Sequence, residues 1–124
     1  MLKEIRDVRQ IEGEPKRRWF FCHAIDLVVW EEENRAICGF QLAYDKHKNE
    51  HALTWHKGRG FAHYVVDDGE PTANVNATPL LYTTDSFDSE RVLMQFLALA
   101  AEIPGEISAF VQAKLRGFAA PPAL

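Results

Sequence analysis

The sequence predicts an α+β domain, in which an antiparallel sheet of six or seven strands, strongly curved or barrel-like, precedes two helices packed on one of its faces. Residues 1–84 hold short β-branched and aromatic runs bounded by turn formers, whereas residues 86–118 place apolar side chains at helical spacing. Strands that precede helices, instead of alternating with them, are typical of this class. No repeat or linker divides the 124 residues, so we expect one domain over 1–124.

The expected strands are residues 3–9, 18–22, 25–31, 36–44, 50–56, 61–66 and 78–83. The connections that follow the third, fourth and fifth of these strands are too short to hold a crossover helix. Consecutive strands should therefore pair antiparallel as hairpins, which makes residues 1–84 a β meander.

A helical hairpin is expected over 86–118, and the Asp88 carboxylate can cap its first helix. Pro104-Gly105 should end that helix, because proline clashes with the preceding turn. A second helix is expected over 107–118, and the tail at 119–124 should fray. The second helix has an apolar stripe at core-facing spacing, formed by Ile107, Val111, Leu115 and Phe118.

Turn lengths also predict which strand residues share a face, because side chains alternate along a strand. The cross-strand pairs that they predict include Val29 with Phe40, Tyr44 with Glu50, and His56 with Phe61. The first face would then hold Ile25, Leu27, Val29, Cys38, Phe40, Leu42, Tyr44, Thr54, His56, Phe61, His63 and Val65. The second face would hold Asp26, Val28, Trp30, Ile37, Gly39, Gln41, His51, Leu53, Trp55, Tyr64 and Val66.

The second face is hardly less apolar than the first, which is unusual for a sheet with water on one side. Three kinds of cover fit this pattern: the N-terminal strand folding back, a second copy of the chain, or a small ligand. Tryptophan and tyrosine favour interface cores. The residues we single out as a partner or ligand face are therefore Trp30, Trp55, Tyr64, Gln41 and Asp26.

Charge and composition argue against several classes of partner. Fourteen Lys and Arg against eighteen Asp and Glu give a net charge of −4, so nucleic acid is not expected. The one basic cluster, Lys16-Arg17-Arg18, is interpreted as the charged lip of a strand. No apolar stretch is long enough to cross a bilayer, so no membrane partner is expected. Two cysteines without a spaced framework, and no secretory signal, favour the cytoplasm.

A zinc site is the one metal centre that the predicted pairing suggests. Cys38, His56, His63 and Glu31 would lie near one end of the first face, and thiolate and imidazole suit zinc. No CxxC or HxxH signature supports it, so semi-buried side chains without a metal are the simpler interpretation, and we expect no cofactor. The acidic run at 67–70 lacks a calcium-loop pattern and is interpreted as a turn.

Asp26 is the most unusual charge in the sequence, because it lies among Ile25, Leu27, Val28 and Val29. A buried carboxylate needs a partner. The candidates are Arg17, Arg18 and Lys46.

Several segments resemble recurring segments of small bacterial proteins that have no assigned activity. These segments are 17–20, 26–30, 39–45, 52–55 and 66–70. The resemblance implies a bacterial, cytoplasmic, stand-alone domain and no catalytic residue.

The leading functional hypothesis is a non-enzymatic module that binds another protein or a second copy of itself, as a homodimer. No nucleophile, dinucleotide or phosphate-loop motif is present to favour an enzyme. The alternative is a small-molecule-binding protein or hydrolase-like enzyme with a pocket between sheet and helices. Its polar groups would be Tyr44, Cys38, His56 and His63.

Overall fold

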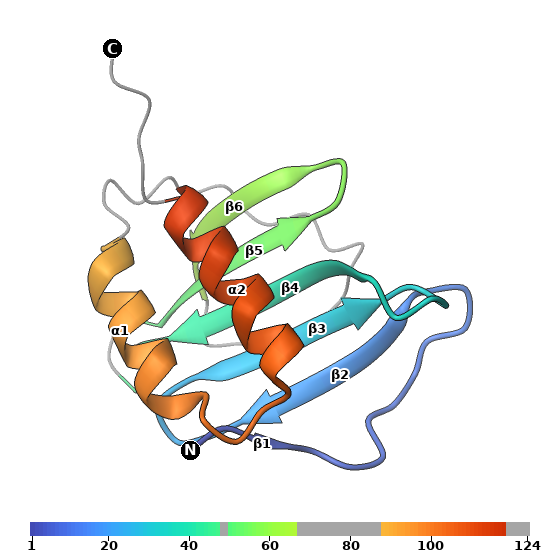
Figure 1. Cartoon of the computed structure of the whole chain (residues 1–124), viewed down its shortest axis with the longest axis horizontal. Coiled ribbons are helices and arrows are strands. Elements are labelled where there is room, and N and C mark those ends of the chain that lie inside the picture. Colours follow the sequence, from blue (N-terminus) through green and yellow to red (C-terminus); the bar gives the residue numbers. More distant parts are fainter. Residues whose placement is uncertain (48–49, 67–87, 119–124) are drawn as a thin grey trace.

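The computed structural model describes residues 1–47, 50–66 and 88–118, and it confirms the α+β class (Figure 1). An antiparallel sheet with the strand order β1 to β6 is followed by two helices, and the sheet is not closed into a barrel. The strands are β1 (Lys3–Glu4), β2 (Lys16–Phe21), β3 (Asp26–Glu31), β4 (Ile37–Tyr44), β5 (His51–His56) and β6 (Gly60–Val65). The strand expected at 78–83, the acidic run at 67–70 and the tail at 119–124 lie outside the described residues.

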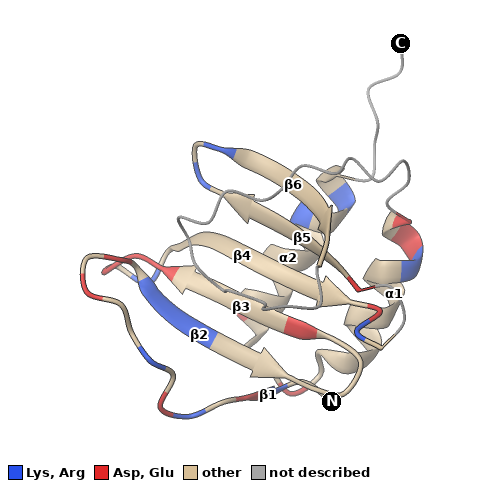
Figure 2. Cartoon of the chain, turned by 180° about the vertical axis from the view of Figure 1, so that it is seen from behind, with Lys and Arg blue, Asp and Glu red and all other residues tan. Residues whose placement is uncertain are grey.

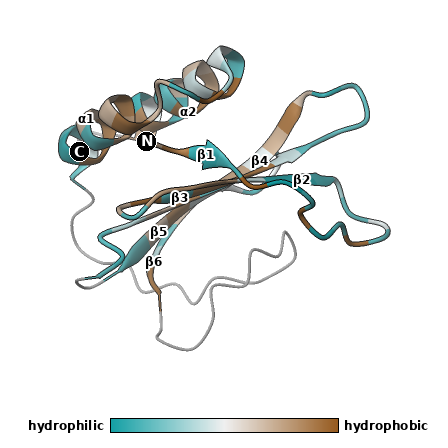
Figure 3. Cartoon of the chain, turned by 90° about the horizontal axis from the view of Figure 1, so that it is seen from below, coloured by the Kyte–Doolittle hydropathy of each residue, from teal (hydrophilic) through white to brown (hydrophobic). Residues whose placement is uncertain are grey.

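The two helices, α1 (Ser89–Leu99) and α2 (Gly105–Phe118), lie on the same face of the sheet (Figure 3). The Asp88 carboxylate accepts a hydrogen bond of 3.2 Å from the Arg91 N–H, which confirms the predicted cap. Apolar side chains from both helices and all of β2 to β5 form one core. Its fully buried members include Leu2, Phe20, Leu27, Val29, Phe40, Leu42, Leu53, Phe96, Val111 and Leu115. Burying each such side chain contributes about 1.5–3 kcal/mol.

The predicted pairing of β3 with β4 is confirmed, whereas that of β5 with its neighbours was wrong by one residue. Val29 lies opposite Phe40 as expected. Tyr44, however, lies opposite His51 instead of Glu50, and His56 opposite Gly60 instead of Phe61. The loop after β4 therefore takes in residue 50, and the next turn is one residue shorter than expected on its β6 side.

The two register shifts exchange the faces of the β5 side chains only. For β6 the two shifts offset one another, so its side chains keep the faces that were predicted for them. Trp55, expected on the second face, lies on the helix face, where its ring contacts Phe110 at a centroid distance of 5.3 Å. His56 and Thr54 move to the second face in exchange. Cys38 also leaves the first face, because β4 bulges between Ile37 and Gly39.

The second face is apolar and buried at its centre, as expected, although both described helices lie on the other side (Figure 3). Val28 and Trp30 are each 1% exposed, and Trp19 and Cys38 pack against them. Ala52 is fully buried on the same face. Trp30 is thus enclosed within the single chain.

The N-terminal strand is much shorter than the predicted 3–9. It pairs with β2 only through Lys3 and Glu4, with one more hydrogen bond from the Ile5 N–H to the Trp19 carbonyl. Asp7 then adopts a left-handed backbone conformation, with φ of 58°, and the chain leaves the sheet. The described helices include none long and apolar enough to span a bilayer.

Candidate functional site at the open edge of strand β2

The site begins where β1 stops covering the outer edge of β2. Continuing the β1–β2 register would place Asp7 opposite Arg17, but the backbone turn at Asp7 prevents this pairing. Along an antiparallel strand, successive residues direct their backbone N–H and carbonyl groups to opposite sides of the strand. The N–H and carbonyl of Arg17 therefore point away from β3 and outward at the edge. We call residues 6–15, which connect the two strands here, the edge loop.

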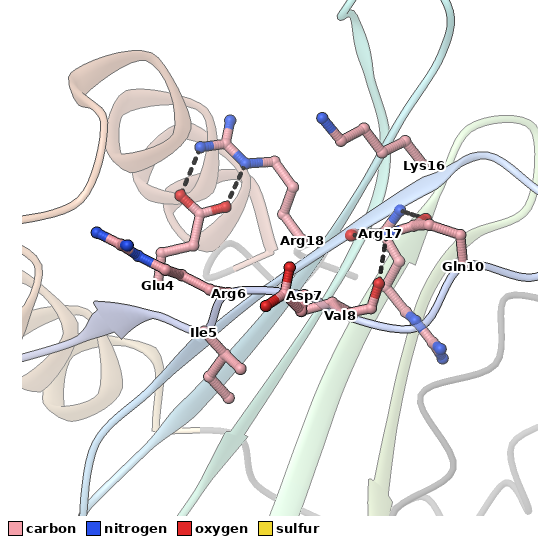
Figure 4. Close-up of a pocket in the computed structure, with 9 residues that line it drawn as sticks. All are labelled: Glu4, Ile5, Arg6, Asp7, Val8, Gln10, Lys16, Arg17 and Arg18. Atoms are coloured by element: carbon pink, nitrogen blue, oxygen red, sulfur yellow. Dashed lines mark hydrogen bonds and ion pairs between the residues drawn. The ribbon is translucent and has the colours of Figure 1, made fainter.

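A side chain takes the place of the missing strand. The Gln10 carboxamide accepts a hydrogen bond of 2.7 Å from the Arg17 N–H and donates one of 2.8 Å to the Arg17 carbonyl (Figure 4). The same nitrogen lies 3.2 Å from the Val8 carbonyl. A carboxamide carries the same donor and acceptor as a peptide bond. Gln10 therefore satisfies Arg17 as a residue of a neighbouring strand would.

Two cavities flank this point and share the side chains of Lys16 and Arg18. The first, of about 630 Å³, lies between β1, β2 and the edge loop; we call it the edge cavity (Figure 4). Its lining is formed by Glu4, Ile5, Arg6, Asp7, Val8, Gln10, Lys16, Arg17 and Arg18. The second, of about 870 Å³, is lined by Gly13, Glu14, Pro15, Lys16, Arg18, Glu31, Glu32, Glu33 and Arg35.

The predicted basic cluster starts β2, as Figure 2 shows, but its three cations do not act together. Arg18 is bound by two hydrogen bonds of 2.8 Å to Glu4 and contacts Glu31 at 3.3 Å. The hydrogen bond from Arg18 lowers the pKa of Glu4, and the same bond raises the pKa of Arg18. Arg17, on the opposite face of the strand, donates to the Arg9 carbonyl. Strand alternation thus argues against a convergent phosphate site.

Two cationic side chains of the edge cavity are not paired with a described carboxylate. Within the described part of the chain, neither Arg6 nor Lys16 forms an ion pair. Among the described lining residues, Asp7 is the one acid besides Glu4, which Arg18 neutralises. The described residues of the cavity wall include no Ser, Thr, Cys, His or Tyr, so they offer binding groups instead of a nucleophile.

The residues predicted as a partner face largely contact other parts of the same chain. Trp30 is buried, and the Tyr64 hydroxyl donates to the Gln41 side chain at 3.1 Å. Asp26 pairs with Lys46 at 2.8 Å, which confirms one of the three partners proposed for it. Trp55, the fifth residue, is on the helix face because of the β5 shift.

The four residues of the suggested zinc site are not brought together. His56 and His63 lie on opposite faces of the sheet, and Glu31 contacts Arg18. The Cys38 thiol donates to the Trp30 carbonyl, and burial, reinforced by Glu32, raises its pKa, which disfavours the thiolate that zinc needs. In residues 1–47, 50–66 and 88–118 no three His, Cys, Asp or Glu side chains converge as a metal site.

The polar groups proposed for a pocket between sheet and helices are also divided. Tyr44 and His63 are joined by a hydrogen bond on the helix face, with the His51 ring stacked 5.3 Å from His63. Burial, together with the charge of His51, lowers the pKa of His63 to about 4. His56 and Cys38 lie elsewhere. The space beneath the helices is filled by core side chains such as Phe96 and Val111.

Sequence reasoning did not identify Gln10 or the edge loop as functional. Gln10 is a single exposed polar residue, and its role depends on a contact with Arg17 that only the folded chain makes. The available signal was the break in strand alternation around Asp7, followed by the turn former Gly13. Comparisons with protein-family models, with curated proteins and with solved structures find no match to this chain.

Proposed function

We propose that the chain is a non-enzymatic protein-interaction module whose binding surface is the open edge of β2. The observation that carries this proposal is the pair of hydrogen bonds between Gln10 and the Arg17 backbone. An extended segment of another protein offers the same donor and acceptor at each residue. It could therefore replace Gln10 at the N–H and carbonyl of Arg17.

The hydrogen-bond energies at this edge permit exchange. Gln10 is exposed, so each of its hydrogen bonds contributes only about 0.5–1.5 kcal/mol, and water accepts the released carboxamide. No core side chain has to move for Gln10 to swing away. The cavities on either side provide room for the side chains of an added segment.

We place this function in the cytoplasm of a bacterium. The support for that compartment is that Cys22 and Cys38 are both free thiols, as is usual where thiols are kept reduced. The bacterial source rests on the resemblance described above.

The test uses a matched pair of variants at one position. Arg17→Ala keeps the outward N–H, whereas Arg17→Pro removes it and leaves the hydrogen bonds to β3 intact, because proline is tolerated at a sheet edge. Decapeptides selected from a random phage library on the immobilised chain would be titrated by fluorescence anisotropy. We expect Arg17→Ala to bind within about threefold of the parent and Arg17→Pro at least about tenfold more weakly.

Two results would count against the proposal. One is equal binding to the parent and to Arg17→Pro, which would locate the peptide site elsewhere. The other is a selection that enriches no peptide at all. Circular dichroism and thermal melting of each variant would establish that it remains folded.

A further inference from the structure

The charges around the edge cavity identify the kind of segment that fits it. This inference rests on the proposed function. Among the described residues, the edge cavity is lined by two cations without an ion pair, Arg6 and Lys16, against the one uncompensated carboxylate of Asp7. Glu4 is neutralised by Arg18. The cavity therefore carries local positive charge on a chain whose net charge is −4.

We infer that the partner is an extended acidic segment of a different protein, which adds as a strand at Arg17 and directs its carboxylates towards Arg6 and Lys16. In an extended segment alternate side chains point to the same side, so carboxylates at every second residue would face the cavity together. Its backbone would take over the two hydrogen bonds that Gln10 makes with Arg17.

A second copy of this chain is a poorer occupant of the same edge. A two-fold antiparallel pairing about Arg17 would bring the run Lys16-Arg17-Arg18 directly against itself. Like charges opposite one another destabilise strand pairs. The charge pattern thus disfavours edge-to-edge self-association and favours a partner of opposite sign.

In this arrangement Gln10 protects the edge until a partner strand displaces its side chain. While it is in place, the Arg17 backbone is satisfied and unavailable to other strands, which limits unspecific edge pairing. Gln10→Ala should leave the edge open. We expect it to raise the affinity for an added strand about threefold or more, because the partner no longer competes with the carboxamide.

The experiment uses defined probes: a fluorescein-labelled decapeptide of alternating Glu and Thr, its Lys and Thr counterpart, and the Glu-Thr peptide with alternate backbone nitrogens methylated in either phase. Binding to the parent chain is followed by anisotropy in about 50 mM and 300 mM salt. We expect the Glu-Thr peptide to bind at least about tenfold more tightly than the Lys-Thr peptide, and more weakly at high salt. Methylation in the phase that faces Arg17 should abolish binding.

Two charge reversals of equal net charge complete the design. Lys16→Glu alters the edge cavity, whereas Arg116→Glu alters the exposed C-terminal turn of α2. We expect Lys16→Glu to weaken the Glu-Thr peptide about fivefold or more and Arg116→Glu to leave it within about twofold.

The outcomes separate this inference from the proposed function. If library-selected neutral or basic peptides bind in an Arg17→Pro-sensitive way but the Glu-Thr peptide does not, the acidic partner is wrong and the interaction edge stands. If the Glu-Thr peptide binds Arg17→Pro or the methylated forms equally well, strand addition is refuted. Sedimentation that shows a dimer dissociated by Arg17→Pro would overturn the assignment to a different protein.

Discussion

A side chain at Gly39 would meet the imidazole of His56 across the second face of the sheet, so replacing Gly39 by alanine tests the β4–β5 register directly. A Cβ atom at this position would lie 2.3 Å from Nδ1 of His56 and 3.1 Å from the Trp55 carbonyl oxygen. The imidazole would have to retreat by about 1 Å to restore van der Waals contact. It has little freedom to do so, because its ring also packs against Trp30 at 5.1 Å between centroids.

Two opposing effects set the change in the free energy of unfolding that Gly39→Ala causes. Overpacking a buried site costs about 1–3 kcal/mol. Alanine in place of glycine within a strand returns about 0.5–1 kcal/mol of backbone entropy. We therefore expect Gly39→Ala to lower the free energy of unfolding by about 1–2 kcal/mol, as measured by urea denaturation followed through tryptophan fluorescence.

The controls isolate the contact with His56. Combined with His56→Ala, Gly39→Ala should cost less than about 0.5 kcal/mol, because the atom it meets is gone. Gly117→Ala, in α2 with nothing within 4 Å of its added carbon, should stabilise the chain by about 0.5–1 kcal/mol. If Gly39→Ala proves as stabilising as Gly117→Ala, then His56 does not lie over Gly39 and the register described for β5 is incorrect.

Three further predictions follow from the buried polar groups. Lys46→Met should lower the free energy of unfolding in urea by about 2 kcal/mol, because it leaves the shielded Asp26 unpaired. Lys57→Met, in an exposed ion pair, should lower it by under about 0.5 kcal/mol, and equal losses would contradict this expectation. Burial holds the pKa of His63 at about 4 against 6.5 ordinarily, so the unfolded chain binds more protons than the folded chain between these pH values. The urea midpoint of unfolding should therefore fall from pH 7 to pH 5, and it should fall less steeply in His63→Gln. A midpoint that does not change with pH would be inconsistent with a buried neutral imidazole. With its pKa raised by burial, the Cys38 thiol should react with iodoacetamide at pH 7 at least about tenfold more slowly than free cysteine, and equal rates would show an accessible thiolate.

The fold class, the strand order and the first helix cap were predictable from the sequence because they depend on local patterns. The predicted register of 25–31 against 36–44 holds from Asp26 to Trp30, whereas the bulge at Cys38 shifts it by one residue next to the turn. The apolar stripe of the second helix identified its core side in the same way, with Ile107, Val111 and Leu115 buried.

The errors in the register of β5 and in the length of β1 arise where a single backbone φ angle decides the path of the chain. Asp45 adopts φ of 54° and the following loop takes in one more residue than expected, which turns all of β5 over. Asp7, at φ of 58°, ends β1 early. Aspartate tolerates this conformation without requiring it, so the sequence alone does not distinguish the two states.

The candidate site was less predictable than the fold. The basic run was correctly interpreted as the lip of a strand, since Lys16 begins β2. Gln10 escaped notice because its contact with Arg17 is set by the path of the edge loop, which no hydrophobic period encodes. The partner face, in contrast, was chosen for aromatic content, and Trp30 proved to be enclosed by its own chain.

The most direct test of the claim that the β2 edge exchanges Gln10 for a partner strand is nuclear magnetic resonance of the ¹⁵N-labelled chain titrated with the Glu-Thr decapeptide. The Gln10 side-chain amide resonances should shift towards those of a free carboxamide. The Arg17 amide proton should also show nuclear Overhauser contacts to the peptide backbone. A peptide that binds while the Gln10 carboxamide and the Arg17 amide resonances stay unchanged would contradict the account.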